Sequence, residues 1–595
     1  MTEPGRPLPR IDFIPELSTC PSCREPLGVY RTETRRVSTL AHGRFEAREW
    51  QLRCDRGEPE RRKGCPTVRS DELSLLVPPR QEFGYDLIDF VGRARYLHGK
   101  QREEIQTELR ERGVQLSTGT ISALCDRFLA HLERLHVLRS PALRAALSQG
   151  YALHIDATCD KGKGGHFLCI DGITGWVLQA ARIDSESGDA LAPVVQRTVE
   201  LFGDPVAVMR DMGKGGAAAV HSLRERGVTD LICHQHFLRA VGNRLLGKPY
   251  GRLRTLLKGL ALRSELIALR KKLKPYKDEV GPDGEFGPGR VRENLQALVH
   301  WLIQGDGKVT PSFPFALPHL QLVLRCESLG ETADTWMPRP WKPAERRAMG
   351  RLRARVDKLK KDPRIGLAVA ELKEGWRVFS ELRGVLRLTR SELPGSSRGG
   401  RQLPIATAEM LRLHEIEMSV RQYEQELEER AGAEADNKRT TRPEAIVLRY
   451  LRRHHHQLFG HPAIRDQDGR IVAVVERTNN VLEHRFGGEK QQLRKRLGRA
   501  ELGRDLQQQP AQAMLVSNLR DSRYVEILCG SLQNLPAAFA RLDRGQVAEV
   551  QLTRDHRDSH LDRLVRDMLR REPEVADAGR LPPPGARIAA NATAV

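Results

Sequence analysis

YALHID, at residues 151–156, opens the part of the chain that decides its fold. HFLCID (166–171) and WVLQAAR (176–182) follow it, and turns rich in Gly and Lys separate the three apolar runs, as in strands joined by hairpins. Further elements are expected downstream in the order helix, strand, helix, strand: residues 190–201, 205–210, 217–226 and 230–232. Three hairpin strands followed by alternating helix and strand predict a layered α/β domain.

The composition limits the class of protein. The chain has 595 residues, of which 39% are hydrophobic, and 98 Lys and Arg against 77 Asp and Glu give a formal net charge of +21. This length predicts about three to five domains. No apolar run approaches the roughly 20 residues of a membrane helix, and no apolar secretion segment opens the chain, so we expect a cytoplasmic protein without a membrane partner. The positive charge recurs along the whole sequence and favours nucleic acid as the partner.

Four cysteines near the N-terminus have the spacing of metal ligands. Cys20 and Cys23 form a CxxC motif, and Cys54 and Cys65 supply a second pair. Four thiolates can complete a tetrahedral Zn²⁺ site, and residues 35–53 alternate as ribbon strands do. We therefore expect a structural zinc ribbon. Four unrelated thiols are the alternative, and a redox role is disfavoured because no thioredoxin-like strand and helix surround the motif.

A group of three helices is expected next, at residues 86–98, 101–112 and 118–132. Gly113 would end the second helix, and Ser117 or Thr118 would cap the third. The apolar spacing fits a helix-turn-helix, whose last helix enters the major groove of DNA, although an ordinary helical hairpin has a similar pattern. The polar side chains that this helix would offer to DNA are Ser117, Thr118, Thr120, Ser122 and Arg127.

Two aspartates stand at the ends of expected strands. Asp156 ends the first apolar run, and Asp211 follows the fourth, just before a Gly-rich turn. Strands that lie side by side would let these acids share Mg²⁺ or Mn²⁺, which prefer oxygen ligands, and two such ions can act on a phosphodiester. Glu483, in the segment TNNVLE, would add a third carboxylate from the first turns of a helix capped by Thr478 or Asn479.

Other acids compete for these roles. Asp160, Asp171 and Asp184 are alternatives for the first ligand, although Asp171 is better explained as a turn residue, and Glu476 is an alternative for the third. We favour Glu483 because basic side chains that can bind phosphate follow it on the same helix. They are Lys490, Arg494, Lys495 and Arg496, with Arg499 beyond them.

Taken together, the order of the strands, the two strand-end aspartates, the helical region after them and the TNNxxE helix resemble the DDE transposases of bacterial insertion sequences. Cys233 and His236, after the fifth strand, look like the CxxH motif of Mutator-like and hAT-like transposases. The N-terminal ribbon and helix-turn-helix are similar to the terminal-repeat-binding region of zinc-ribbon-bearing relatives. The resemblance extends from about Cys20 to Arg499.

The resemblance implies a multidomain α/β protein with a ribonuclease H-like catalytic core that a large all-α insertion interrupts. Asp156, Asp211 and Glu483 would be catalytic ligands of Mg²⁺ or Mn²⁺, while Cys233 and His236 would be structural or contact DNA. The implied activity is binding of terminal inverted repeats, strand cleavage, and transfer of the 3′-hydroxyl into target DNA. A homodimer or higher oligomer would assemble on double-stranded DNA in the nucleoid of a bacterium.

Two groups of side chains, several tryptophans and a histidine tract, have more than one possible role. A tryptophan from the insertion of such enzymes often holds a flipped base; Trp336 and Trp341, in a proline-rich loop, are candidates, as are Trp301 and Trp376, and core packing explains each equally well. We interpret the tract 454–456, three consecutive histidines, as a solvated surface, because consecutive helical residues point in different directions.

The expected organisation has six parts. They are a zinc ribbon, a helix-turn-helix, the first part of the catalytic core, a helical insertion, the final core helix and a helical C-terminal region with a disordered tail: residues 1–80, 81–145, 146–250, 251–468, 469–505 and 506–595. Two other functions remain open. One is a transposase-derived DNA-binding regulator without transposition activity, and the other is a ribonuclease H-like nuclease.

Overall fold

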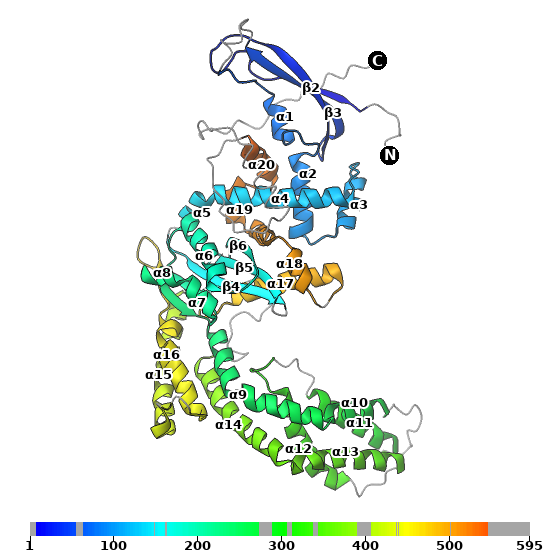
Figure 1. Cartoon of the computed structure of the whole chain (residues 1–595), viewed down its shortest axis with the longest axis vertical. Helices are drawn as coiled ribbons and strands as arrows, with labels where there is room; N and C mark the ends of the chain where they lie inside the picture. Colours follow the sequence, from blue (N-terminus) through cyan, green and yellow to red (C-terminus); the bar gives the residue numbers. More distant parts are fainter. Residues whose placement is uncertain are drawn as a thin grey trace. The chain divides into compact units, whose positions relative to one another are not determined.

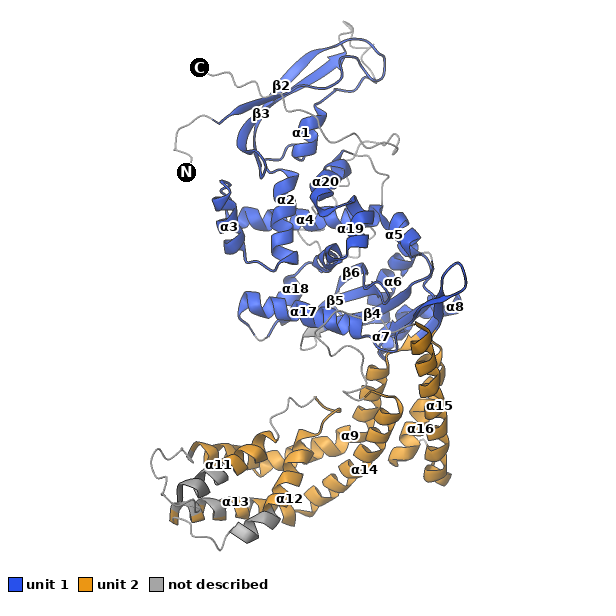
Figure 2. Cartoon of the chain, turned by 180° about the vertical axis from the view of Figure 1, so that it is seen from behind, with its two compact units in different colours: residues 1–230, 462–595 blue, residues 231–461 orange. Residues whose placement is uncertain are grey.

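The computed structural model describes residues 8–54, 64–147, 149–160, 163–272, 288–305, 312–336, 343–388, 406–435, 437, 440–499 and 501–544. The protein is mixed α/β and divides into two compact units, which Figure 2 colours separately. Unit 1 comprises Met1–Asp230 and Pro462–Val595, and unit 2 comprises Leu231–His461. Among the described helices, none has the length and apolar character needed to cross a membrane.

The N-terminal part of unit 1 is a three-stranded sheet of order β1-β3-β2. β1 (Arg10–Phe13) runs parallel to β3 (Gly43–Cys54), and β2 (Leu27–Thr39) pairs antiparallel with β3. The expected ribbon strands are therefore confirmed. Helix α1 (Asp71–Leu76) closes a small core on one face of the sheet, formed by Phe13, Val37, Phe45, Ala47, Leu73 and Val77.

The three expected helices after the ribbon are confirmed, with one difference in length. They are α2 (Tyr85–Gly92), continued by the π-turn η2 (Arg93–Leu97), then α3 (Arg102–Glu111) and α4 (Thr118–Leu138). Gly113, at φ 79°, lies just beyond the C-terminal end of α3, and Ser117 caps α4. α4 runs past the expected end at residue 132 because every residue from 128 to 137 is buried, so that this half has no polar face to mark it in the sequence.

The central sheet of unit 1 has the order β6-β5-β4-β7-β8 (Figure 1). β5 pairs antiparallel with both β4 and β6, whereas β7 runs parallel to β4. The strands are β4 (Ala152–Asp160), β5 (Lys163–Asp171), β6 (Val177–Ile183), β7 (Ala207–Arg210) and β8 (Thr229–Ile232). Helices α6 (Gly188–Phe202), α7 (Lys214–Ala219) and α8 (His221–Glu225) connect β6, β7 and β8. The layered α/β domain is confirmed.

The C-terminal part of the chain belongs to the same core. Its elements are the hairpin β9 (Ala463–Arg465) and β10 (Ile471–Val474), then α17 (Asn480–Leu497), α18 (Gly503–Gln508), η4 (Ala511–Arg520), α19 (Ser522–Cys529), η5 (Leu532–Asn534) and α20 (Leu535–Asp543). The side chain of Asn518 accepts the N–H of Val177 at 2.8 Å and donates to its C=O at 2.9 Å. It thereby satisfies both backbone groups of Val177 on β6. One hydrophobic cluster joins α2, α4, the sheet and residues 511–542. The expected disordered tail lies outside the described residues.

Unit 2 consists of helices in the part that the structure describes. They are α9 (His234–Gly259), α10 (Leu262–Lys272), α11 (Pro288–Gln304), α12 (Pro318–Trp336), α13 (Pro343–Lys361), α14 (Pro363–Val385), α15 (Ala406–Ala431), the short η3 (Gly432–Glu434) and α16 (Pro443–Phe459). The insertion was expected at residues 251–468. It begins earlier, at Leu231, because α9 is one continuous helix from just after β8, and it ends at His461.

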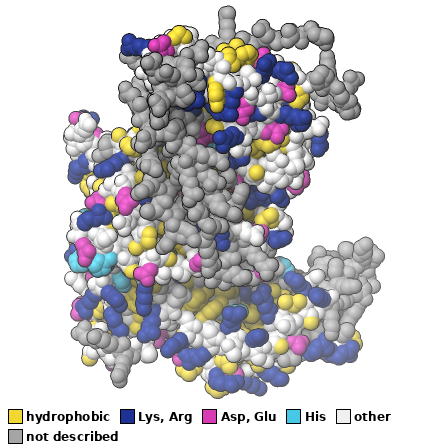
Figure 3. All heavy atoms as spheres, turned by 45° about the horizontal axis from the view of Figure 1, so that its top comes forward, with side chains coloured by type: hydrophobic (Ala, Val, Ile, Leu, Met, Phe, Trp, Pro, Cys, Tyr) yellow, Lys and Arg dark blue, Asp and Glu magenta, His cyan; other side chains and the backbone are white. Residues whose placement is uncertain are grey.

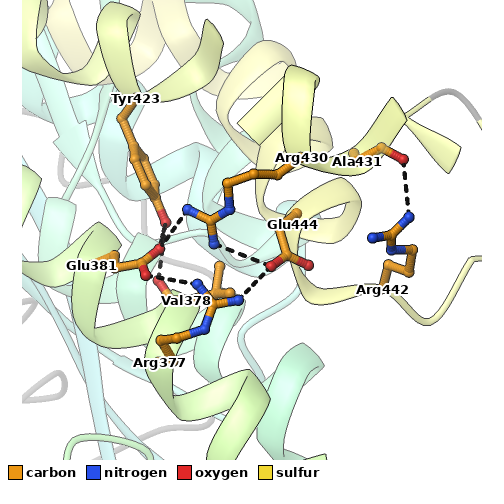
Figure 4. A network of polar contacts seen from close by, with 8 residues as sticks. All are labelled: Arg377, Val378, Glu381, Tyr423, Arg430, Ala431, Arg442 and Glu444. Atoms are coloured by element: carbon orange, nitrogen blue, oxygen red, sulfur yellow. Dashed lines mark hydrogen bonds and ion pairs between the residues drawn. The ribbon is translucent and has the colours of Figure 1, made fainter. Parts of the chain in front are cut away.

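A network of charged side chains holds three helices of unit 2 together (Figure 4). Arg377 of α14 donates to Glu381 at 2.8 Å and to Glu444 at 2.7 Å, and Arg430 of α15 donates to the same two carboxylates at 3.0 and 3.1 Å. The Tyr423 hydroxyl donates to Glu381 at 3.0 Å. Two guanidinium groups and two carboxylates therefore neutralise one another across α14, α15 and α16.

The histidine tract was interpreted as solvated surface, and for His455 this was wrong. Its ring is mostly buried between Glu417 and Glu424 of α15, at 3.5 and 3.6 Å, which lie two helical turns apart. Because α16 packs along α15, one of three consecutive histidines is turned into the helix interface.

Candidate active site and metal centre

The pairing of β4 with β7 determines where the two aspartates lie. The strands pair in parallel with His154 opposite Met209. Asp156 and Asp211 each follow the last printed pair of this register by two residues, and the charge of Asp211 acts on the Asp156 carboxyl. The expectation that Asp156 ends its strand was wrong, because β4 continues to Asp160; Asp156 instead marks the point where β4 loses its β7 neighbour.

The main chain at Asp211 is held by a buried ion pair. Arg210 donates to both carboxylate oxygens of Asp230 on β8, at 2.7 and 2.8 Å, and also to the C=O of Asp211 at 2.9 Å. The Asp211 carboxylate accepts the N–H of Gly213 at 2.9 Å. The backbone carbonyl and the side-chain carboxylate of Asp211 are therefore both held in place before any ligand binds.

The Gly-rich turn after β7 allows a close approach of two loops. A Cβ atom at Gly215 would lie 1.7 Å from the C=O oxygen of Glu186, in the loop between β6 and α6. Only glycine fits there, and the contact brings a fourth carboxylate, which sequence reasoning missed, towards the two aspartates. No periodicity marks Glu186; the only signal is its place just before Ser187, which caps α6.

Asn479 connects the start of α17 to β4. Its side chain is fully buried, and Nδ2 donates to the C=O of Ile155 at 3.1 Å while Oδ1 lies 3.0 Å from Nδ1 of His154. Because a carbonyl oxygen can only accept, the amide must face this way, and His154 must carry its proton on Nδ1. Asn479 occupies the N-cap position of α17 as expected, but its side chain makes no capping bond, since β4 takes both of its polar atoms.

Glu483 lies one turn into α17 and is brought to Asp156 by this connection. Burial, together with the negative charges of Asp211, Glu483 and Glu186, raises the pKa of Asp156 to about 7, although the N–H of Ala157, which donates to it at 2.8 Å, acts in the opposite direction. The structure therefore brings the three predicted acids together, with Glu186 as a fourth.

The donor set of this acidic site suits a hard divalent cation, because carboxylate oxygens are its preferred ligands. The carboxylate oxygens do not form one tight cage: in the described ranges, the four-cysteine cluster is the only set of three or more ligating side chains whose atoms lie within 4.8 Å of one another. Two ions about 3.5–4 Å apart require a wider spread of ligands than one ion does. The chemistry of the carboxylates suits divalent cations of this kind.

The competing acids occupy other environments. Asp171 is fully buried and accepts the N–H and hydroxyl of Thr174 at 2.8 and 2.7 Å, so it is a turn residue, as the sequence indicated. Asp184 is exposed on the loop after β6, and Asp160 is the last residue of β4. Glu476 lies between β10 and α17, outside the helix.

The four N-terminal cysteines do come together as one centre. Cys23 Sγ lies 3.3 Å from Cys54 Sγ and 3.7 Å from Cys65 Sγ, and the Cys54 thiol lowers the pKa of Cys20 to about 6. Metal–sulfur bonds of about 2.3 Å in a tetrahedron separate the sulfurs by about 3.8 Å. All four are free thiols, and the turn after Cys20, with Arg24 at φ 62°, presents the first pair as a knuckle. These residues can hold one structural metal ion.

The residues expected to face DNA lie at the start of α4, and several are also used locally. Ser117 is exposed, and its Oγ accepts the N–H of Thr120 at 3.0 Å. Ser122 donates to the C=O of Thr118 at 3.1 Å. Thr118, Thr120, Ser122 and Arg127 are half-buried. Only the first turns of α4 are open to a partner, since the helix is buried from residue 128 onwards.

The basic side chains of α17 do not all share one face. Arg494 and Lys495 are exposed and Lys490 is half-buried. Arg496 differs, because burial, followed by the charge of Arg95, lowers its pKa, and Tyr96 lies among its other neighbours. Arg496 therefore faces η2 and does not share the side of α17 that carries the exposed Arg494 and Lys495.

The remaining predicted residues lie in unit 2. Cys233 is buried at the N-cap of α9 and His236 is half-buried one turn on, while His234 between them is 2.7 Å from the C=O of Leu458. Trp376 packs against Phe379 at 5.6 Å. Trp301 is half-buried on α11. The side chain of Trp336 and the whole of Trp341 lie outside the described residues.

Comparison with known proteins identifies no relative: no protein-family model matches the chain, and no curated protein matches it.

Proposed function

We propose that the protein is a DDE-type DNA transposase with a ribonuclease H-like core, which binds the ends of an insertion sequence, cleaves a strand at each end and joins the 3′-hydroxyl to target DNA. One observation carries the proposal. The charges of Asp211 and Glu483, which come from distant parts of the chain, act on the buried carboxyl of Asp156, and Asn479 joins the N-cap of the helix that carries Glu483 to the strand that carries Asp156.

The acids would hold two Mg²⁺ or Mn²⁺ ions, which activate a water or a 3′-hydroxyl and stabilise the leaving oxygen of a phosphodiester. The chain itself supplies position and charge. Asp211 is fixed by the Arg210–Asp230 pair, Glu483 is fixed through Asn479, and the exposed cations of α17 extend from the acids to meet phosphate groups.

The N-terminal parts would recognise the DNA ends. The thiol centre would hold structural Zn²⁺ and thereby stabilise the β2–β3 ribbon, and the exposed first turn of α4 would read double-stranded DNA in the major groove. Two DNA ends must be held at once, so the active assembly would be a homodimer or a higher oligomer in the bacterial cytoplasm.

A strand-transfer assay tests the proposal. The protein is incubated with Mg²⁺, a target plasmid and the DNA that flanks its gene. We expect joined products that are lost in Asp156→Asn and Glu483→Gln, whereas Asp184→Asn, an exposed acid on the neighbouring loop, retains them. End binding without cleavage in the wild type would indicate a DNA-binding regulator, and cleavage of RNA or branched DNA without joining would indicate a ribonuclease H-like nuclease.

A further inference from the structure

Three arginines from three separate elements of unit 1 converge beside α4. Arg95 comes from η2, Arg102 from α3 and Arg496 from α17, and the charges of all three act on the buried thiol of Cys125. Arg102 donates to Ser122 of α4 at 3.2 Å. Arg95 is close enough to Arg496 for its charge to lower the pKa of that guanidinium.

No carboxylate neutralises this group by direct contact. Within the described part of the chain, none of the three arginines forms an ion pair, although Glu489 and Asp126 act on the surroundings from further away. The neighbouring cations behave differently, because Lys100 and Arg112 both pair with Glu108, at 2.5 and 3.2 Å.

One nitrogen of the group also lacks a partner. Nε of Arg496 is buried without a hydrogen bond. Arg95 and Arg496 are half-buried and Arg102 is exposed. The two half-buried charges repel each other by more than they would in water, and a buried N–H without an acceptor adds to the cost. An anion seated among them removes both costs.

We propose that Arg95, Arg102 and Arg496 form a phosphate-binding surface for the backbone of a DNA duplex, next to the exposed first turn of α4. The surface rests on the proposed function for the identity of its partner. Guanidinium groups bind phosphate oxygens in pairs of parallel hydrogen bonds, and the N-terminus of α4 favours negative charge at the same place. Figure 3 shows that Lys and Arg side chains recur widely over the visible face. Positive charge alone therefore does not identify a DNA contact, and the lack of ion pairs at these three arginines is what distinguishes them.

The surface also sets a spacing on the DNA. Glu483 and Arg496 are both on α17, and at about 1.5 Å per residue they lie about 20 Å apart along the helix. At 3.4 Å per base pair this corresponds to about six base pairs. A duplex that follows α17 would therefore be held about six base pairs from the phosphate that is cut.

The test is the salt dependence of DNA binding by the full-length protein. The slope of log K against log salt concentration is negative, and each lost phosphate contact reduces its magnitude by about 0.9. We expect Arg95→Gln and Arg496→Gln each to make the slope less negative by about 1, on a random-sequence duplex as on the DNA next to the gene, and the triple variant to make it less negative by about 2 to 3. Arg112→Gln, whose charge is paired with Glu108, is the matched control and should leave the slope unchanged. Thermal melts of each variant would verify the fold.

The outcomes separate the two proposals. A wild-type protein that binds no duplex overturns the proposed function and this inference together. A wild type that binds DNA, with well-folded variants whose slopes match that of Arg112→Gln, overturns the inference alone. Phosphate ethylation that interferes with binding about six base pairs from the cleavage position would support it, and interference confined to other positions would contradict it.

Discussion

Replacing Asn479 by alanine should loosen β4 and inactivate the acidic site without changing any acid. The Asn479 side chain joins the N-cap of α17 to β4 by two hydrogen bonds, and it is completely buried. Its removal leaves the C=O of Ile155 and the Nδ1–H of His154 without their present partners. Glu483, one turn further along, would lose the anchor that keeps it beside Asp156.

The magnitude follows from the two lost bonds. A buried polar group that loses its partner costs about 1–3 kcal/mol, so two such groups cost about 2–6 kcal/mol. A displacement of about 1 Å in a group that positions a reaction costs about 100-fold in rate. Water cannot easily take the place of the amide, because the His154 ring packs closely on its other side: a Cβ at Gly172 would lie 2.2 Å from His154 Nε2.

Hydrogen exchange measured by mass spectrometry is the assay that resolves this effect. The opening free energy of β4 amides in Asn479→Ala should fall by about 2–6 kcal/mol, while helices of unit 2 keep the protection of the wild type. Asn479→Asp should do as much damage, because it keeps the volume but sets an oxygen against the C=O of Ile155. Asn480→Ala is the matched control, since Asn480 is the next residue and half-buried.

The refuting result is equally definite. If Asn479→Ala and Asn480→Ala give the same exchange in β4 and the same rate of strand cleavage, Asn479 does not position Glu483. Because exchange is measured without DNA or metal, this result stands whatever the enzyme's substrate is.

Three further predictions concern other parts of the chain. Cys20→Ser, or chelation of the metal, should release stoichiometric Zn²⁺ and open the ribbon to protease, whereas Cys529→Ser should do neither. Glu489→Gln should raise the free energy of unfolding by about 3 kcal/mol at pH 8, because burial raises the pKa of Glu489 from 4.5 to about 7; the gain shrinks as the pH falls through 7 and disappears below about 4.5. Arg430→Ala should lower the opening free energy of amides in unit 2, measured by hydrogen exchange, by about 2 kcal/mol, since Glu444 is almost fully buried and loses one of its two cations.

Each of these three can fail in a specific way. Purified protein without zinc would contradict the thiol centre. If burial raises the pKa of Glu489, its charge must appear between about pH 5 and pH 8. The stability difference between Glu489→Gln and the wild type must then change over that range, and a constant difference would show that burial does not raise this pKa. Unchanged exchange in α14 to α16 after loss of Arg430 would show that Arg377 alone suffices for both carboxylates.

The parts of the fold that the sequence predicted are those governed by local pattern. The strands of the central sheet have apolar runs bounded by turn residues, and the four cysteines needed only their spacing to indicate a metal centre. Ser117 or Thr118 was predicted as the cap of α4 from residue type and position, and Ser117 is the one that caps it. In each case the information lies within a few residues of the feature.

The features that sequence reasoning missed depend on partners far along the chain. Thr478 or Asn479 was expected to cap α17, but the amide of Asn479 bonds a carbonyl 324 residues away instead. Glu186 entered the acidic site only because Gly215 permits a close backbone contact. The second half of α4 carried no amphipathic signal because a helix that is buried all round has none.

The C-terminal segment connects the region proposed to recognise DNA with the acidic site. Asp543, at the end of α20, accepts a hydrogen bond from Tyr85 of α2 at 2.7 Å and lies 3.0 Å from His131 of α4. Tyr85 belongs to the hydrophobic cluster that also contains Leu482 and Phe486 of α17. Two domains joined by a flexible linker would place a bound DNA end near the acids only as often as the linker allows. A shared core keeps the first turn of α4 and Glu483 at a constant separation. If the proposed function holds, the distance from the recognised sequence to the cleaved phosphate would then be set by this shared core.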